Sequence, residues 1–126
     1  MGVIRFKLGV ELTRMDPAGV RLIGSLDRVA RSMPVDLTVT CGCEGHPASD
    51  PHTLGRAYDV RTHDLTPDQK DFVLRGMLLD LQESDTDAPV AVSDGLATTR
   101  FFGWLEHPGE DDEHLHVQQR KGVTFP

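Results

Sequence analysis

Aromatic residues and long apolar runs are scarce in this sequence. Of its 126 residues 6% are aromatic, with one tryptophan and one tyrosine. No apolar run approaches the roughly 18 residues that a membrane-spanning helix requires, so we expect no contact with a membrane. The N-terminus, from Met1 to Lys7, lacks the apolar core of a signal peptide. This predicts a protein that is cytoplasmic as synthesised and that reaches the outside by release or with a phage particle.

Cysteines are few and basic residues are outnumbered. Cys41 and Cys43 are separated by one residue, which is too strained a spacing for a structural disulfide, so both are predicted to be reduced. The 13 Lys and Arg residues face 20 Asp and Glu residues, for a formal net charge of -7. Nucleic-acid binding depends on the neutralisation of phosphates by Lys and Arg. The charge balance therefore argues against a nucleic-acid partner.

The overall composition is that of a globular protein. The sequence is 38% hydrophobic and 26% charged, and its length suits one domain covering residues 1–126. Predicted helices stand before and between short predicted strands. This order predicts an α+β fold, in which helices pack on one face of a small antiparallel sheet.

Two helices have clear start signals. Asp16 followed by proline predicts an N-cap, and Thr66 with Gln69 forms a capping box. Apolar residues then follow helical spacing, starting at Val20 in the first helix and at Phe72 in the second. The predicted helices cover residues 17–32 and 67–81. Alternating or apolar segments predict strands at residues 3–12, 35–40, 57–61, 90–92, 101–105 and 114–118.

The polar segment from Gly42 to Pro51 has no periodicity. It could form a lip over a substrate or an ordinary surface connection, and the sequence favours neither. Three histidines, His46, His63 and His107, are predicted to be ordinary loop residues.

A candidate metal site begins with His52 and Asp59. Gly55 between them permits a tight turn, so the two side chains can converge. Strand alternation places Asp59 on the face opposite Tyr58 and Val60, where it can point into a cleft.

A second polar cluster follows at residues 113–118. His114, His116 and Gln118 share one face of the predicted strand there, and apolar residues share the other. One imidazole from this cluster, added to His52 and Asp59, gives three nitrogen and oxygen ligands. Catalytic zinc prefers such a set and keeps its fourth position for water.

These two motifs together resemble the zinc D-alanyl-D-alanine peptidases of bacterial cell walls. Their relatives include vancomycin-resistance dipeptidases, phage endolysin peptidases and the hedgehog domain. The resemblance rests on the stretches 52–59 and 113–116. It implies a hedgehog/DD-peptidase-like fold that binds Zn²⁺ through His52, Asp59 and His116. It further implies that Glu113 is the catalytic carboxylate and that His114 lies in the site.

Three residues leave open whether the site is catalytic and which residue is the base. Asp50 and Glu44 occupy positions where the family usually has serine and arginine. Glu106 is the alternative to Glu113 as the base, because the turn between Trp104 and His116 can fold it back to the metal.

The resemblance implies a zinc metallopeptidase that hydrolyses peptidoglycan stem peptides or other peptides containing D-amino acids. Carboxypeptidase and murein endopeptidase action both remain open. The loss of the arginine, with Glu44 in its place, weakly favours endopeptidase action. The alternative is a non-catalytic, metal-stabilised binding or structural domain of the same fold, such as a phage tail or assembly component.

Overall fold

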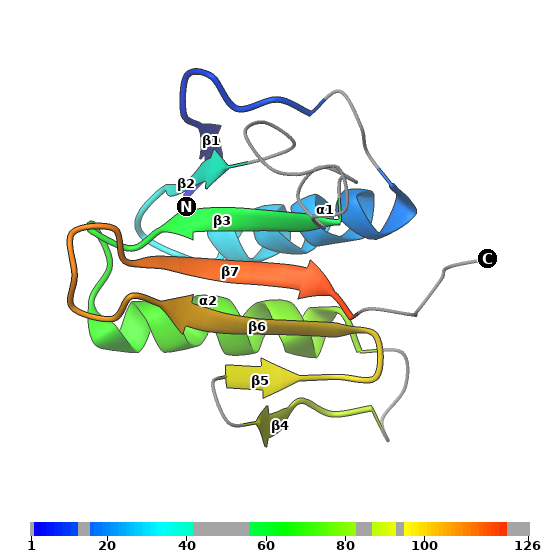
Figure 1. The fold of residues 1–126 in the computed structure, drawn as a ribbon. Coiled ribbons are helices and arrows are strands. Elements are labelled where there is room, and N and C mark those ends of the chain that lie inside the picture. Colours follow the sequence, from blue (N-terminus) through cyan, green and yellow to red (C-terminus); the bar gives the residue numbers. More distant parts are fainter. Residues whose placement is uncertain (1, 13–15, 42–55, 83–86, 93–94, 121–126) are drawn as a thin grey trace.

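The computed structural model describes residues 2–12, 16–41, 56–82, 87–92 and 95–120. These residues form an α+β fold with two helices and one seven-stranded sheet (Figure 1). The helices are α1 (Pro17–Arg31) and α2 (Pro67–Asp80). The strands are β1 (Ile4–Phe6), β2 (Leu37–Cys41), β3 (Ala57–Arg61), β4 (Val90–Val92), β5 (Gly95–Ala97), β6 (Phe101–Glu106) and β7 (His114–Gln119).

The sheet is mixed, and the prediction of a purely antiparallel sheet is wrong at one edge. The strand order is β1-β2-β3-β7-β6-β5-β4, and β1 pairs with β2 in parallel. Helix α1 connects these two strands, and parallel neighbours need such a crossover. The remaining pairs are antiparallel.

Two strand predictions also need correction. The strand predicted at residues 3–12 is reduced to the three residues of β1, and the chain turns away around Gly9, whose φ is 96°. Strand β5 is an addition to the predicted strands, because its three residues are too few to show alternation. Both differences lie toward the edges of the sheet.

The helix start signals act as predicted. The Asp16 carboxylate accepts a hydrogen bond from the backbone N–H of Ala18 at 3.0 Å. Thr66 and Gln69 form the reciprocal capping box at the start of α2. No helix among the described residues has the length and apolar character needed to cross a membrane.

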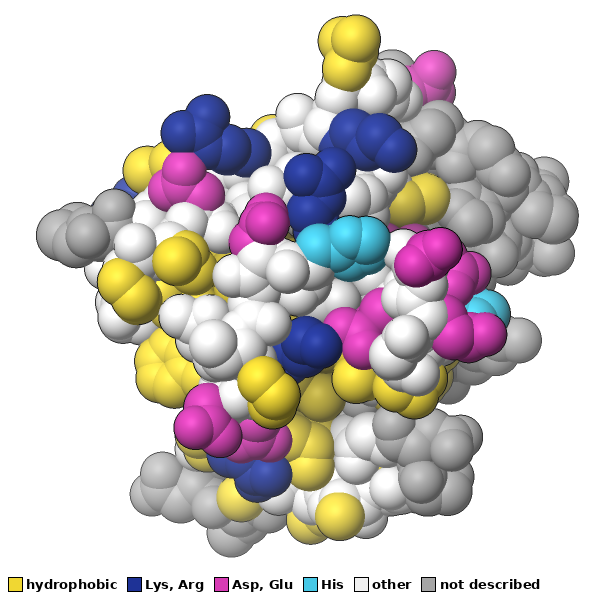
Figure 2. Space-filling view, turned by 90° about the vertical axis from the view of Figure 1, so that its left-hand side faces the viewer, with side chains coloured by type: hydrophobic (Ala, Val, Ile, Leu, Met, Phe, Trp, Pro, Cys, Tyr) yellow, Lys and Arg dark blue, Asp and Glu magenta, His cyan; other side chains and the backbone are white. Residues whose placement is uncertain are grey.

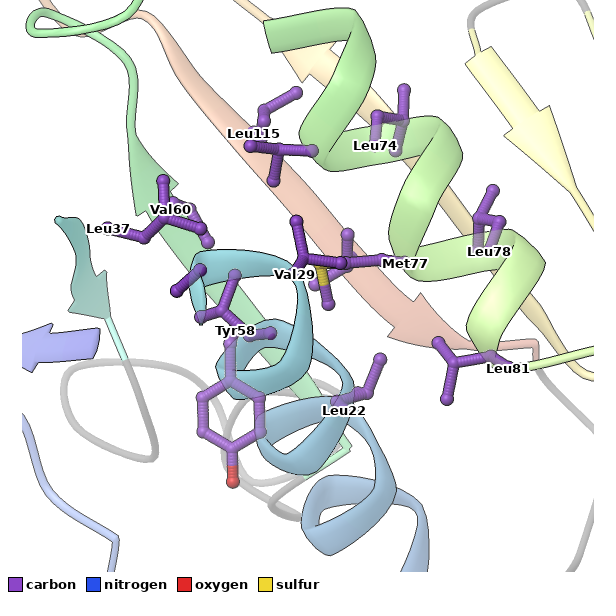
Figure 3. Close-up of a cluster of buried hydrophobic side chains, with 14 of the residues drawn as sticks. Leu22, Val29, Leu37, Tyr58, Val60, Leu74, Met77, Leu78, Leu81 and Leu115 are labelled. Atoms are coloured by element: carbon purple, nitrogen blue, oxygen red, sulfur yellow. The ribbon is translucent and has the colours of Figure 1, made fainter. Parts of the chain in front are cut away.

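Both helices cover the same face of the sheet, and the core lies between them and the strands (Figures 1 and 3). Leu22 from α1 and Met77 from α2 pack in one cluster with Tyr58 of β3 and Leu115 of β7, and each of these residues is at most 1% exposed. At two positions the helical spacing predicts a core residue, but the side chain is exposed. Val20 and Phe72 are 55% and 48% exposed.

Candidate metal and hydrolytic site

The candidate site lies on the face of the sheet that carries no helix. Strand β7 runs between β3 and β6, so its residues have cross-strand neighbours on both sides. His116 pairs with Asp59 on one side and with Trp104 on the other. Cross-strand partners project from the same face of a sheet. These three residues therefore form one row of side chains across three strands.

A second row lies beside the first. His114 pairs with Arg61 on β3 and with Glu106 on β6. Because side chains on a strand repeat every two residues, His114 and His116 share a face, as the sequence predicts. The sheet register thus brings together residues that are up to 57 positions apart in the chain.

The Asp59 carboxylate lies between the two histidines. Its Oδ1 is 2.9 Å from Nδ1 of His116, and its Oδ2 is 3.6 Å from Nε2 of His114. The side chains of Asp59 and His116 are 13% and 8% exposed, so this contact is largely shielded from water. A close pair of this kind is electrostatically stronger than the same pair at the surface.

The His116 ring is fixed on three sides. Nδ1 faces Asp59, Nε2 is 2.7 Å from Oε1 of Gln118, and the Trp104 ring packs against the imidazole at a centroid distance of 4.3 Å and an interplanar angle of 33°. Burial lowers the pKa of His116, but the hydrogen bonds to Asp59 and Gln118 and the charges of Asp59 and Glu106 outweigh it. The net pKa is raised. In the imidazolium form both ring nitrogens donate, and loss of the Nδ1 proton exposes a lone pair toward Asp59.

Glu106 faces both histidines. Its Oε1 lies 3.5 Å from Nδ1 of His116, and its Oε2 lies 3.6 Å from Nε2 of His114. The side chain is 28% exposed, so water reaches this carboxylate. His114 is oriented by its own Nδ1, which donates to the backbone carbonyl of Asp112 at 2.8 Å. Its Nε2 is therefore the nitrogen that points toward Asp59 and Glu106.

Glu113 is held in a different set of contacts. Its Oε1 accepts hydrogen bonds from Lys70 Nζ and from the Thr62 hydroxyl at 2.5 and 2.6 Å, and its Oε2 accepts one from the Gly109 N–H at 2.7 Å. The hydrogen bonds from Lys70, Thr62 and Gly109 lower the pKa of Glu113 to about 2. A carboxylate with so low a pKa is a weak base.

Asp59 and His116 supply donor atoms of the types that zinc binds. The 2.9 Å between Asp59 Oδ1 and His116 Nδ1 is a hydrogen-bond distance. Two ligands of a tetrahedral zinc are about 3.4 Å apart, so these two atoms would have to separate slightly to hold one. Nε2–H of His116 donates to Gln118 Oε1, and a contact of this kind fixes the tautomer of a metal-binding histidine. His52, the third predicted ligand, lies outside the described residues, as do Asp50 and Glu44.

A separate group of metal-ligand types occurs on the turn between β6 and β7. His107, Glu110 and Asp112 bring one ligand atom each within 4.8 Å of one another. All three are exposed, and exposed acidic groups are common on loops. We therefore regard the half-buried site on the sheet as the stronger candidate for a functional site.

A cavity of about 380 Å³ adjoins the candidate site. Asp59 and His114 line it, together with Cys41 at the end of β2. The cavity gives a substrate room beside His114, as expected for a binding site.

Comparison with family models, with curated proteins and with solved structures finds no match to this chain. The resemblance to the zinc peptidases therefore rests on the motif residues. The structure brings Asp59, His114 and His116 together and adds two residues to which the sequence analysis gave no role, Trp104 and Gln118. Both could have been found from alternation, because each lies on the same strand face as a predicted site residue.

Proposed function

We propose that this protein is a zinc-dependent peptidase that cleaves peptide bonds in murein stem peptides or similar peptides containing D-amino acids. The observation that carries this proposal is the cluster on the helix-free face, where Asp59, Glu106, His114 and His116 converge within 3.6 Å contacts. The choice of substrate follows from the motif resemblance at residues 52–59 and 113–116.

The metal ligands of this site would be Asp59 and His116, with His52 as the third. A zinc ion held there would act as a Lewis acid on the peptide carbonyl and acidify water. Gln118 keeps the proton on Nε2 of His116, which leaves Nδ1 available for the metal. Trp104 packs against the ring and prevents its rotation.

Glu106 is the carboxylate best placed to act as the general base. It is partly exposed, faces both histidines and accepts no short hydrogen bond from a lysine, in contrast to Glu113. It would take a proton from the attacking water and pass it to the leaving amine.

His114 is placed to stabilise the negative charge that develops on the carbonyl oxygen. Its Nδ1–H already donates to the Asp112 carbonyl. Donation to an oxyanion therefore requires a proton on Nε2 as well. The two neighbouring carboxylates, Asp59 and Glu106, lie 3.6 Å from that nitrogen.

The proposal is tested by zinc analysis and a hydrolysis assay on purified protein. We expect close to one zinc per chain, loss of zinc in His116→Ala, and release of peptide fragments from murein by the zinc-loaded protein. Glu106→Gln should keep the zinc and reduce kcat by about 100-fold or more. Glu110→Gln is the matched control, since Glu110 is 67% exposed on the neighbouring turn and should retain activity. Full activity in Glu106→Gln would show that Glu106 is not the general base.

One observation favours the alternative of a non-catalytic domain. His116 already has a partner for each ring nitrogen, Asp59 and Gln118, so the site is satisfied without a metal. A protein that binds no zinc after metal addition, and whose stability is unchanged by zinc, would support this alternative. Zinc binding without hydrolysis of any stem peptide would support a metal-stabilised binding domain.

A further inference from the structure

The cavity beside the candidate site has walls of opposite charge. The basic residues Lys7 and Arg61 line it, and so do the acidic residues Asp111 and Asp112. Figure 2 looks onto this end of the molecule. In that view, basic side chains lie above a histidine and acidic side chains lie to its right.

The basic wall is built by β3 and by the segment that follows β1. Arg61 shares a strand face with Asp59 and pairs across the sheet with His114, so it lies directly beside the candidate site. Lys7 lines the same cavity, and its N–H donates to the Val39 carbonyl of β2 at 2.9 Å, which holds this segment against the sheet.

The acidic wall is built by the turn between β6 and β7. The Glu113 carboxylate holds this turn by accepting the Gly109 N–H at 2.7 Å, and Gly109 adopts a φ of 80° that favours glycine. Glu113 is itself tied to α2 through Lys70. Asp111 and Asp112 therefore stand on a turn that is fixed to the body of the protein.

The other two acids that line the cavity have partners within the protein. Asp59 accepts a hydrogen bond from His116, and Glu113 accepts hydrogen bonds from Lys70 and Thr62. Asp112 also has a neighbour, because its Oδ2 lies 3.7 Å from Nδ1 of His107. The charges that the walls offer to a ligand are therefore the cations of Lys7 and Arg61 and the anion of Asp111, with Asp112 shared with His107.

We propose that this cavity binds a substrate group that carries a carboxylate and an ammonium on the same carbon. The carboxylate would pair with Arg61 and Lys7, and the ammonium with Asp111 and Asp112. In a peptide, such a zwitterion occurs inside the chain only on the side chain of a diaminodicarboxylic acid. Building on the function proposed above, the preferred substrate is a stem peptide whose third residue is diaminopimelate rather than lysine.

Two stem peptides that differ only at the third residue test this inference. The lysine peptide keeps the ammonium but lacks the carboxylate. We expect the zinc-loaded protein to cleave the diaminopimelate peptide with a kcat/KM about tenfold or more higher, which is the effect of a charge-assisted contact. Arg61→Gln should reduce this ratio toward one. Arg31→Gln is the matched control, because Arg31 is 65% exposed on α1 and pairs with Asp27.

Binding measurements keep this inference separate from the hydrolysis itself. Calorimetric titration of zinc-loaded Glu106→Gln with each peptide should show the same preference without turnover. Lys7→Gln is the second variant, since Lys7 is exposed outside the strands and its replacement leaves the fold intact. Equal affinity for the two peptides, or a preference that survives both Arg61→Gln and Lys7→Gln, would overturn the inference. Preferential binding without cleavage by the wild-type protein would instead overturn the proposed hydrolysis and leave this inference standing.

Discussion

The two faces of the central strand β7 differ in kind. Leu115 and Val117 point to the helices and are each 1% exposed. His114 and His116 point to the opposite face, where both face the Asp59 carboxylate and where the Trp104 ring packs against His116. One strand thus supplies the core and the candidate site at the same time. Core residues and candidate-site residues alternate along this strand, so mutations on the two faces should have separable effects on stability and on the candidate site.

The same contrast holds for the two glutamates at the ends of the turn between β6 and β7. Glu106 ends β6 and faces the histidines, whereas Glu113 precedes β7 and reaches Lys70 on α2. Glu113 therefore fixes the turn, and Glu106 is the glutamate that we propose as the general base. The two residues are chemically identical, so the register of the β6–β7 hairpin determines which one faces the histidines.

Leu115→Ala should have the largest effect on stability. The side chain is 1% exposed in the core, and its truncation leaves a cavity beneath both helices. We expect the free energy of unfolding to fall by about 2–5 kcal/mol, measured by urea denaturation. His114→Ala, one residue away on the other face, should change it much less. Equal losses for the two variants would remove the distinction between the faces.

Gly103→Ala should affect both faces. An added Cβ would lie 2.7 Å from Leu74 Cδ1 and 2.9 Å from the backbone oxygen of His116. We expect a loss of about 1–3 kcal/mol from overpacking, together with weaker zinc binding, because the His116 backbone must shift. Thermal denaturation and a zinc titration of the same sample check the two effects. Unchanged zinc affinity in a destabilised variant would show that the site tolerates movement of β7.

Glu113→Gln should lower stability at neutral pH by about 1–3 kcal/mol, because it removes charge-assisted hydrogen bonds from Lys70 and Gly109. The pKa of Glu113 is lowered from 4.5 to about 2. Its contribution is therefore complete above about pH 4.5 and is lost as the pH falls toward 2. Unfolding curves at pH 7, 4 and 3 should show the difference between wild type and variant shrinking. A difference that grows on acidification would contradict this sign.

Asp80→Asn should have the smallest effect. Asp80 accepts two hydrogen bonds from Arg28 at 2.9 and 2.7 Å, and the hydrogen bonds from Arg28 lower the pKa of Asp80. Arg28 is 58% exposed, so water and salt screen the pair. We expect a loss below about 1 kcal/mol that shrinks further in high salt. A loss as large as that of Leu115→Ala would show that the contact between α1 and α2 depends on this pair.

Local signals account for much of the fold. The N-cap at Asp16 and the capping box at Thr66 are each complete within a few residues, so the helix starts could be predicted from sequence. The alternation in β3 and β7 likewise predicted which side chains share a face. The parallel pairing of β1 could not be predicted, because its partner β2 lies more than 30 residues further along the chain. Strand β5 could not be predicted because its three residues are too few to show alternation.

The sequence by itself determined the residue types of the candidate site and their strand faces, because alternation is a local property of the backbone. It also determined that Asp59, His114 and His116 could contribute to one site. Only the tertiary structure decided which glutamate faces the histidines and which one pairs with Lys70. It also decided that Arg61 and Asp111 line the same cavity. The physical reason is that cross-strand register and the packing of a turn against a helix join residues distant in the chain, and no local pattern encodes those contacts.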